Sequence, residues 1–248
     1  MVKQSKSQIL AIKLKKDIDN HIYPFGSLFP SERTLSEEYH LSRTTIRDAI
    51  NDLINQGYLK KSHGKGTFVT KNSRADLQIN FKGMSELLKR AGFTPFSSII
   101  ASEKRKAGYK LSQIFNISEN EEIFRIIRLR GGNQQPISIE DTYVPCRLVP
   151  QIENIDFQIF SLYDILASHG IQIDYINHIF STAKVRNNEA KILNLQDGET
   201  VISIDISSYT KSKEIVEYTH VLVVSEFCGF YSDSYFKNGE AFIYAQSN

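Results

Sequence analysis

The most constraining feature of this sequence is a pair of predicted helices separated by a very short turn. Ser31 is placed to cap the first helix, which ends near His40, and Ser42 is placed to cap the second, residues 43–56. Apolar residues recur in the second helix at helical spacing, so one of its faces is expected to be buried: Ile46, Ile50, Leu53 and Ile54. An amphipathic helix over residues 8–20 is predicted to precede the pair.

A basic, glycine-rich hairpin follows the second helix. Gly57 ends the helix, and residues 58–61 and 67–70 alternate as strands do around the segment Ser62-His63-Gly64-Lys65-Gly66. A short turn between two helices, with Arg and Thr in the first turns of the second, is the arrangement that places side chains in the major groove of DNA. The hairpin is then expected to act as a wing beside that helix.

Charge is distributed unevenly along the 248 residues. Residues 1–74 hold 13 lysines and arginines against 7 acidic residues, whereas the remainder holds 17 against 21. A basic segment is a candidate for contact with phosphates, although a solvated surface gives a similar count. The length suits two domains of ordinary size.

Composition excludes several other classes of protein. The hydrophobic share is 41%, and no apolar run approaches the roughly 18 residues of a membrane span. The N-terminal residues lack the apolar region of a secretory signal, so a cytoplasmic protein without membrane association is expected. Cys146 and Cys228 stand far apart without a partnering histidine cluster, so neither a metal site nor another cofactor is predicted.

The segment FPSERTLSEEYHLSRTTIRDAINDLINQGYLKKSHGKGTFV resembles the DNA-binding domain of the GntR family of bacterial regulators. The resemblance implies that Arg33 and Arg43 approach guanines, whose O6 and N7 atoms match a guanidinium group. It further implies contacts to phosphates or base edges from four residues: Ser42, Thr44, Thr45 and Arg47. His63, Gly64, Lys65 and Gly66 would form the wing tip near the minor groove.

Simpler roles are also open to three of these residues. Arg47 has nearby carboxylates in Asp48 and Asp52, with which it can pair within the helix. Thr45 can satisfy its own backbone, as threonines early in helices often do. His63 can be an ordinary turn residue.

The remainder of the chain predicts an α+β domain with an antiparallel sheet. The polar stretch 72–80 is expected to link a DNA-binding domain, residues 1–71, to a second domain, residues 81–248. The predicted strands of the second domain are 97–106, 123–130, 137–144, 171–185, 201–210 and 215–226, and its predicted helices are 85–91, 112–115, 161–169 and 188–193.

The order of these elements resembles the UTRA effector domain, the partner of this winged helix in the HutC-type branch of GntR proteins. The resemblance rests on FRIIRLRGGNQQPISIEDTYVP, SLYDILASHG, NNEAKILNLQDGETVISIDISSYT and KEIVEYTHV. It implies a fold related to chorismate lyase. Residues 223–227 depart from the pattern, because the tyrosine and arginine expected near Val223 and Val224 are absent.

Charged residues on the predicted strands are candidates for binding an effector. Arg128 and Arg130 lie two apart on one strand, so their side chains share a face and together can hold a phosphate or carboxylate. By resemblance, Glu140 and Glu217 hold hydroxyl or amino groups of the ligand. The simpler interpretation places all four on solvent-exposed surfaces.

Two helix starts add hydroxyl groups to this candidate site. Ser161 and Tyr163 open one helix and offer a hydroxyl and backbone N–H groups to an anion. Ser85 opens another, in the segment that resembles the loop closing over a phosphate. Each of the two serines can instead be a helix cap.

These features together predict a ligand-responsive repressor and not an enzyme. A homodimer would place two recognition helices on a palindromic double-stranded operator, and a small anion, best a phosphorylated sugar, would alter their spacing. A small carboxylate is the alternative effector. A lyase-like enzyme is disfavoured because no catalytic motif is present, and a purely architectural DNA-binding protein does not need a second domain of this size.

Overall fold

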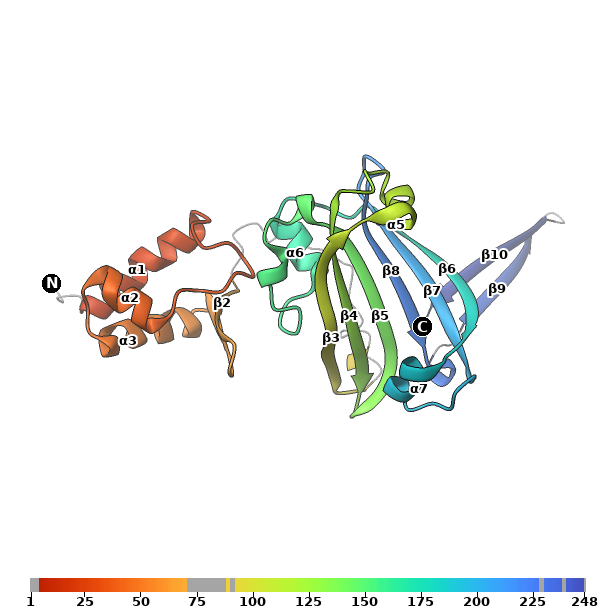
Figure 1. Ribbon diagram of the computed structural model, residues 1–248, viewed down its shortest axis with the longest axis horizontal. Helices are drawn as coiled ribbons and strands as arrows, with labels where there is room; N and C mark the ends of the chain where they lie inside the picture. The colour runs from red at the N-terminus through yellow and green to blue at the C-terminus, as the bar shows by residue number, and fades with distance from the viewer. Residues whose placement is uncertain (1–4, 71–87, 90–91, 228–229, 238–239, 248) are drawn as a thin grey trace. The chain divides into compact units, whose positions relative to one another are not determined.

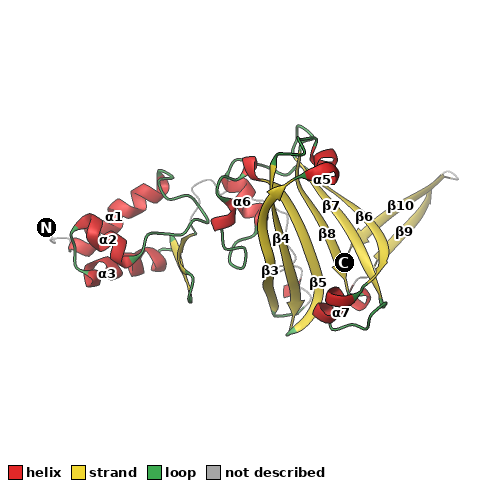
Figure 2. Cartoon of the chain, viewed as in Figure 1, coloured by secondary structure: helices red, strands yellow, loops and turns green. Residues whose placement is uncertain are grey.

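The computed structural model describes residues 5–70, 88–89, 92–227, 230–237 and 240–247, with side chains described up to residue 227. Its contacts divide the chain into two compact units, residues 1–83 with 146–173, and residues 84–145 with 174–248. Figure 1 shows the elements of each unit, and Figure 2 shows that helices dominate the first while strands dominate the second.

The first unit opens with a three-helix bundle and a hairpin. Ser5, Ser31 and Ser42 cap the helices, each accepting a hydrogen bond from a backbone N–H in the first turn. The core is apolar and contains Leu14, Leu35, Ile46 and Leu53, all fully buried. The elements are α1 (Lys6–Asp19), α2 (Glu32–Tyr39), α3 (Arg43–Asn55), β1 (Leu59–Ser62) and β2 (Gly66–Val69). The predicted helix-turn-helix and wing are therefore confirmed.

Residues 146–173 group with this N-terminal bundle although they are distant in sequence. They contain η1 (Cys146–Leu148), η2 (Ile152–Asn154) and α6 (Leu162–Ser168). The Phe160 ring packs edge-on against Phe25 and Phe68, with centroids 5.3 and 6.0 Å away. The predicted linker, residues 72–80, lies outside the described residues, so the predicted domain boundary stays a prediction.

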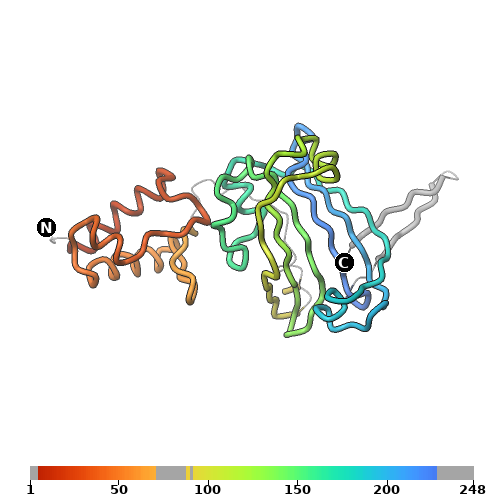
Figure 3. The backbone as a smooth tube through the Cα atoms, in the orientation of Figure 1, coloured from red at the N-terminus to blue at the C-terminus, as the bar shows by residue number. Residues whose placement is uncertain are grey.

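The second unit is built on a six-stranded antiparallel sheet. The strand order is β3-β4-β5-β8-β7-β6, and Figure 3 follows the backbone through it. The strands are β3 (Pro95–Lys106), β4 (Glu122–Gly132), β5 (Gln135–Pro145), β6 (Tyr175–Lys184), β7 (Thr200–Tyr209) and β8 (Ile215–Val223). The register pairs Arg128 with Glu140 and Thr142 with Thr219, so residues from three strands lie side by side at the centre.

The two faces of this sheet differ in what covers them. One face, here called the Arg125 face, packs against α5 (Gly108–Phe115) through Leu111 and Phe115, and against α7 (Asn187–Leu193) through Leu193. The other, here called the Arg128 face, is apolar near the β4–β5 turn, where Leu88 packs with Ile137, Val221 and Val223. Farther along the strands, the Arg128 face carries buried polar side chains.

A further hairpin follows the sheet. It consists of β9 (Phe230–Lys237) and β10 (Glu240–Ser247), paired antiparallel, and residues 225–227 form the short helix η3 (Ser225–Phe227) before it. The sequence reasoning did not predict this hairpin, and it extended the preceding strand to residue 226. In the described part of the chain, no helix has the length and apolar character needed to cross a membrane.

Candidate functional site

The first turn of α3 presents a set of small polar and basic side chains. Ser42 Oγ accepts a hydrogen bond from the Thr45 backbone N–H at 3.2 Å, and the two hydroxyl oxygens lie 2.8 Å apart. Arg43 and Thr44 are exposed and Thr45 is half-buried. The capping of Ser42 therefore fixes the helix start and directs Arg43 and Thr44 to solvent. The Thr45 hydroxyl therefore contacts the capping serine, a partner that the simpler interpretation did not name.

The other two arginines of this motif hold carboxylates. Arg33 Nε donates to Glu37 Oε1 at 2.9 Å within α2. Arg47 pairs with Glu32 of the preceding helix through Nη2 and Nε, at 2.9 and 3.2 Å, and not with Asp48 or Asp52 as the alternative held. These hydrogen bonds lower the pKa of Glu32 below its ordinary value. Exposed ion pairs of this kind contribute at most about 1 kcal/mol, so a phosphate can replace either carboxylate.

The wing tip is a tight turn whose two glycines have positive φ. Gly64 has φ +72° and Gly66 φ +117°, a backbone conformation that other residues adopt only with strain. His63 and Lys65 are exposed. Lys65 Nζ donates to Gln158 Oε1 at 2.6 Å and to Asp156 Oδ1 at 3.2 Å, so the wing lysine contacts the segment 146–173. Sequence reasoning did not predict this contact.

A buried charge cluster occupies the centre of the Arg128 face. Glu140 Oε2 accepts from Arg128 Nη2 at 2.9 Å and from Arg130 Nε at 3.1 Å. All three side chains are at most 13% exposed, so the interpretation that they lie on a solvent face is wrong. Burial, the largest influence, raises the pKa of Glu140, but the two guanidinium groups outweigh it and the pKa lies below its ordinary value. The cluster thus holds two positive charges against one negative charge.

A stripe of buried hydroxyl groups continues from this cluster along the same face. Thr219 Oγ1 donates its one proton to Glu217 Oε1 at 2.7 Å. Thr142 Oγ1 lies 3.0 Å from Thr219 Oγ1, which can accept from it. Ser208 Oγ donates to Glu217 Oε2 at 2.6 Å. Glu217 is therefore buried and hydrogen-bonded, not a surface glutamate. Sequence reasoning missed the hydroxyl groups, although each follows an alternating strand pattern that places it on this face.

The structure does not bring the three remaining candidate residues to the arginine cluster. Ser85 lies outside the described residues. Ser161 stands at the N-cap of α6, but its side chain makes no capping hydrogen bond. Tyr163 is half-buried in the first turn of that helix. Because α6 belongs to the first unit, the proximity of Ser161 and Tyr163 to the arginine cluster stays a prediction.

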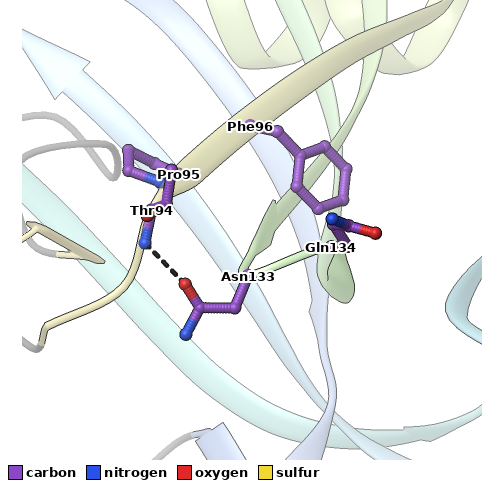
Figure 4. Close-up of a pocket in the computed structure, with 5 residues that line it drawn as sticks. All are labelled: Thr94, Pro95, Phe96, Asn133 and Gln134. Carbon is purple, nitrogen blue, oxygen red and sulfur yellow. Dashed lines mark hydrogen bonds between the residues drawn. The ribbon is translucent and has the colours of Figure 1, made fainter.

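An open hollow of about 660 Å³ lies at the end of the sheet where β3 begins. It is lined by Thr94, Pro95, Phe96, Asn133 and Gln134, and Figure 4 shows the Phe96 ring beside Gln134. The Thr94 N–H donates to Asn133 Oδ1 at 2.9 Å and closes one side. Among the described residues that line it, none is a predicted effector residue and none is charged.

Two models of known protein families match this chain. The UTRA domain model matches residues 90–226, and the model of the bacterial regulatory proteins of the gntR family matches residues 6–69. The chain belongs to the GntR family of UTRA-containing regulators. It is therefore a transcription regulator that joins a DNA-binding head to an effector-binding domain, and its relatives are regulators, not enzymes.

Individual relatives agree with this assignment. The HTH-type transcriptional repressor NagR of Bacillus subtilis is 28% identical over 219 residues, covering 88% of this chain and 86% of NagR. The histidine utilization repressor of Pseudomonas putida is 25% identical over 189 residues, covering 76% of each. The crystal structure of PhnF from Mycobacterium smegmatis matches with a TM-score of 0.56 at 21% identity, covering 87% of this chain and 94% of PhnF. The PhnF match supports the fold alone.

Proposed function

We propose that this GntR regulator is a repressor that binds a palindromic operator as a homodimer and responds to a small anion bound on the Arg128 face. The observation that carries the proposal is the buried cluster of Arg128, Glu140 and Arg130. A sugar phosphate is the effector that fits it best.

The charge of the cluster favours an anionic ligand. Guanidinium groups stay protonated in proteins, and Glu140, with its lowered pKa, stays ionised at neutral pH. Among these three side chains, two guanidinium groups face one carboxylate, so a ligand that brings negative charge is favoured beside them. Arginine forks match the oxygens of a phosphate or a carboxylate.

The stripe beside the cluster favours a polyhydroxylated ligand. Glu217, Thr219 and Ser208 form a buried hydrogen-bonded chain on the same face as the arginines. Such groups exchange hydrogen bonds with hydroxyl or amino groups, as a sugar offers, and exact pairing gives specificity. We infer that Ser85, Ser161 and Tyr163 complete the site around the anion. The second candidate effector is a small carboxylate, whose oxygens match the same guanidinium groups.

The DNA contacts proposed for the head follow from its exposed groups. Arg43 and Arg33 are proposed to contact guanines, while Ser42, Thr44, Thr45 and Arg47 contact phosphates or base edges. The wing tip, His63 to Gly66, is proposed to approach the minor groove. Two copies of α3 in successive major grooves would require a two-fold symmetric operator. An effector releases the operator only if it binds the conformation that cannot bind DNA more tightly than the conformation that can.

Ligand screening tests the effector class. Purified protein is titrated calorimetrically with hexose phosphates, the matching unphosphorylated hexoses and small carboxylates, after a thermal-shift screen. We expect a hexose phosphate to bind and its unphosphorylated counterpart not to bind. Arg130→Gln removes one of the two guanidinium groups and should weaken that binding about 10- to 100-fold, because one charge-assisted hydrogen bond contributes about 1.5–3 kcal/mol.

Arg125→Gln is the matched control for this variant. Arg125 lies on the same strand but on the opposite face, where it pairs with Asp141 at 2.8 Å. Its loss should leave ligand affinity unchanged. If only carboxylates bind, the second candidate replaces the first, and if no anion binds, the proposed effector class is wrong.

A further inference from the structure

Two serines flank Arg130 on the Arg128 face of the sheet. The register pairs Arg130 of β4 with Ser97 of β3 on one side and with Ser138 of β5 on the other. Residues paired across antiparallel strands have their side chains on the same face, with Cβ atoms about 5 Å apart. The three side chains therefore form a row across three neighbouring strands, next to the row that holds Arg128 and Glu140.

The hydroxyl groups of these two serines are buried without a partner. Ser138 is 0% exposed, and among the described residues neither Ser138 Oγ nor Ser97 Oγ has a hydrogen-bond partner. Other hydroxyl groups on this face differ, since those of Thr219 and Ser208 donate to Glu217. A buried hydroxyl group without a hydrogen bond is unfavourable, and alanine would fill the same place without that cost. A role in stability therefore does not explain the two serines.

The row offers donors of two kinds to a ligand. Each serine hydroxyl can donate one hydrogen bond, and the guanidinium group between them has five N–H donors and a permanent positive charge. Glu140 accepts from Arg130 at Nε. Hydrogen bonds to a charged acceptor are shorter and stronger than those between neutral groups. The charge of the arginine therefore selects an anion, and the hydroxyl groups on either side of it can each bind one oxygen of that anion.

The number of donors distinguishes a phosphate group from a carboxylate. A carboxylate has two oxygens in one plane, and one guanidinium group can bind both in a bidentate pair. A phosphate group has three terminal oxygens, all of them strong acceptors. These oxygens point to the corners of a tetrahedron, so at least one remains for a donor beside the arginine. A row of hydroxyl, guanidinium and hydroxyl groups therefore matches a phosphate better than a carboxylate.

We propose that Ser97 and Ser138 donate hydrogen bonds to the phosphate group of the effector and so select a phosphate over a carboxylate. The proposal rests on the proposed function, because it takes an anion to bind at the Arg128–Glu140–Arg130 cluster. It adds two residues and a discrimination that the arginines alone do not provide, since guanidinium groups bind both kinds of anion. Binding of the phosphate gives the two buried hydroxyl groups their partners.

Calorimetric titration of the full chain with inorganic phosphate and with acetate, at equal ionic strength, tests the discrimination. Wild type should bind phosphate more tightly than acetate. Ser138→Ala and Ser97→Ala should each weaken phosphate binding about 10- to 100-fold, because each removes a hydrogen bond to a charged group, and should leave acetate binding unchanged. Ser203→Ala is the matched control, since Ser203 is a buried serine of β7 on the opposite face. Its affinity for either anion should not change.

The titration separates failure of this proposal from failure of the proposed function. If wild type binds phosphate and both alanine variants bind it equally well, the serines do not contact the anion, and only this proposal is overturned. The same holds if wild type binds acetate as tightly as phosphate. If wild type binds neither anion, the anion site itself is wrong and both proposals fail.

Thermal stability in phosphate-free buffer gives a second test. Ser138→Ala and Ser97→Ala should keep or raise the wild-type Tm, because neither hydroxyl group has a hydrogen bond to lose. Ser208→Ala should lower the Tm, because the buried Ser208 hydroxyl donates to Glu217 at 2.6 Å. If Ser138→Ala loses as much stability as Ser208→Ala, the Ser138 hydroxyl has a partner within the protein and the proposal is overturned.

Discussion

Replacing Glu140 by glutamine is the perturbation whose effect the structure defines most closely. The variant keeps the shape of the side chain but removes the carboxylate that the buried Arg128 and Arg130 guanidinium groups share. Removing one partner of a buried ion pair costs about 3–5 kcal/mol. In a protein of this size each kcal/mol lowers Tm by roughly 2–4 °C. We therefore expect Glu140→Gln to lower the Tm of the second unit by about 10 °C.

Differential scanning calorimetry measures this change and offers an internal check. Added phosphate should raise the Tm of Glu140→Gln by more than it raises that of wild type at equal ionic strength, because the variant has lost the negative charge that Arg128 and Arg130 share. Asp141→Asn is the control, since Asp141 is the adjacent residue on the opposite face and its pair with Arg125 is part-exposed. It should lose about 1 kcal/mol or less. Equal losses in the two variants, or no selective gain with phosphate, would refute the reasoning.

The same variant predicts a pH dependence with a defined sign. The pKa of Glu140 is lowered from 4.5 in the folded protein. A carboxyl group with a lowered folded pKa contributes stability above its unfolded pKa and loses it as the pH falls through the folded pKa. The Tm difference between wild type and Glu140→Gln should thus be constant near neutrality and shrink below about pH 4.5. A difference that grows on acidification would contradict the assignment.

The remaining predictions concern the DNA-binding head. Arg43→Ala should lose about 1–3 kcal/mol of base discrimination. Fluorescence anisotropy measures this loss on an operator selected from random DNA and on its single-base variants. An equal loss of affinity on all sequences would mean that Arg43 contacts only the DNA backbone. Lys65→Ala should instead weaken binding to all DNA sequences equally, and it should reduce the slope of log affinity against log salt concentration by about one. Asp156→Asn removes the carboxylate that holds Lys65 in the free protein and should strengthen operator binding a few-fold; unchanged affinity would show that this contact does not compete with DNA.

Local sequence signals predicted the DNA-binding head well because each of its elements has a local cause. Ser31 and Ser42 cap α2 and α3 as predicted, and the glycines of the wing adopt positive φ. The partner of Arg47 was not predicted, because spacing rules find neighbours within a helix and Glu32 belongs to the preceding helix. Contacts between elements depend on their packing, which a single sequence does not specify.

In the effector-binding unit, too, the sequence predicted local features but not the contacts between distant elements. Alternation placed Arg128 and Arg130 on one face, but only the packed sheet shows that this face is buried and that Glu140 lies between them. The grouping of residues 146–173 with the N-terminal bundle had no sequence signal, because its contacts join residues far apart, such as Lys65 and Gln158. The β9–β10 hairpin was not predicted, because residues 230–247 come after the last segment that resembles the UTRA domain.

Operator binding measured by anisotropy during titration with a hexose phosphate tests the central claim most directly. The account predicts that the wild type releases a selected operator as the ligand is added, whereas Arg130→Gln binds the same operator but requires about 10- to 100-fold more ligand to release it. The unphosphorylated hexose should have no effect on either protein. A wild type that releases DNA equally well with the unphosphorylated hexose, or an Arg130→Gln variant with wild-type response, would contradict anion sensing by the Arg128–Glu140–Arg130 cluster.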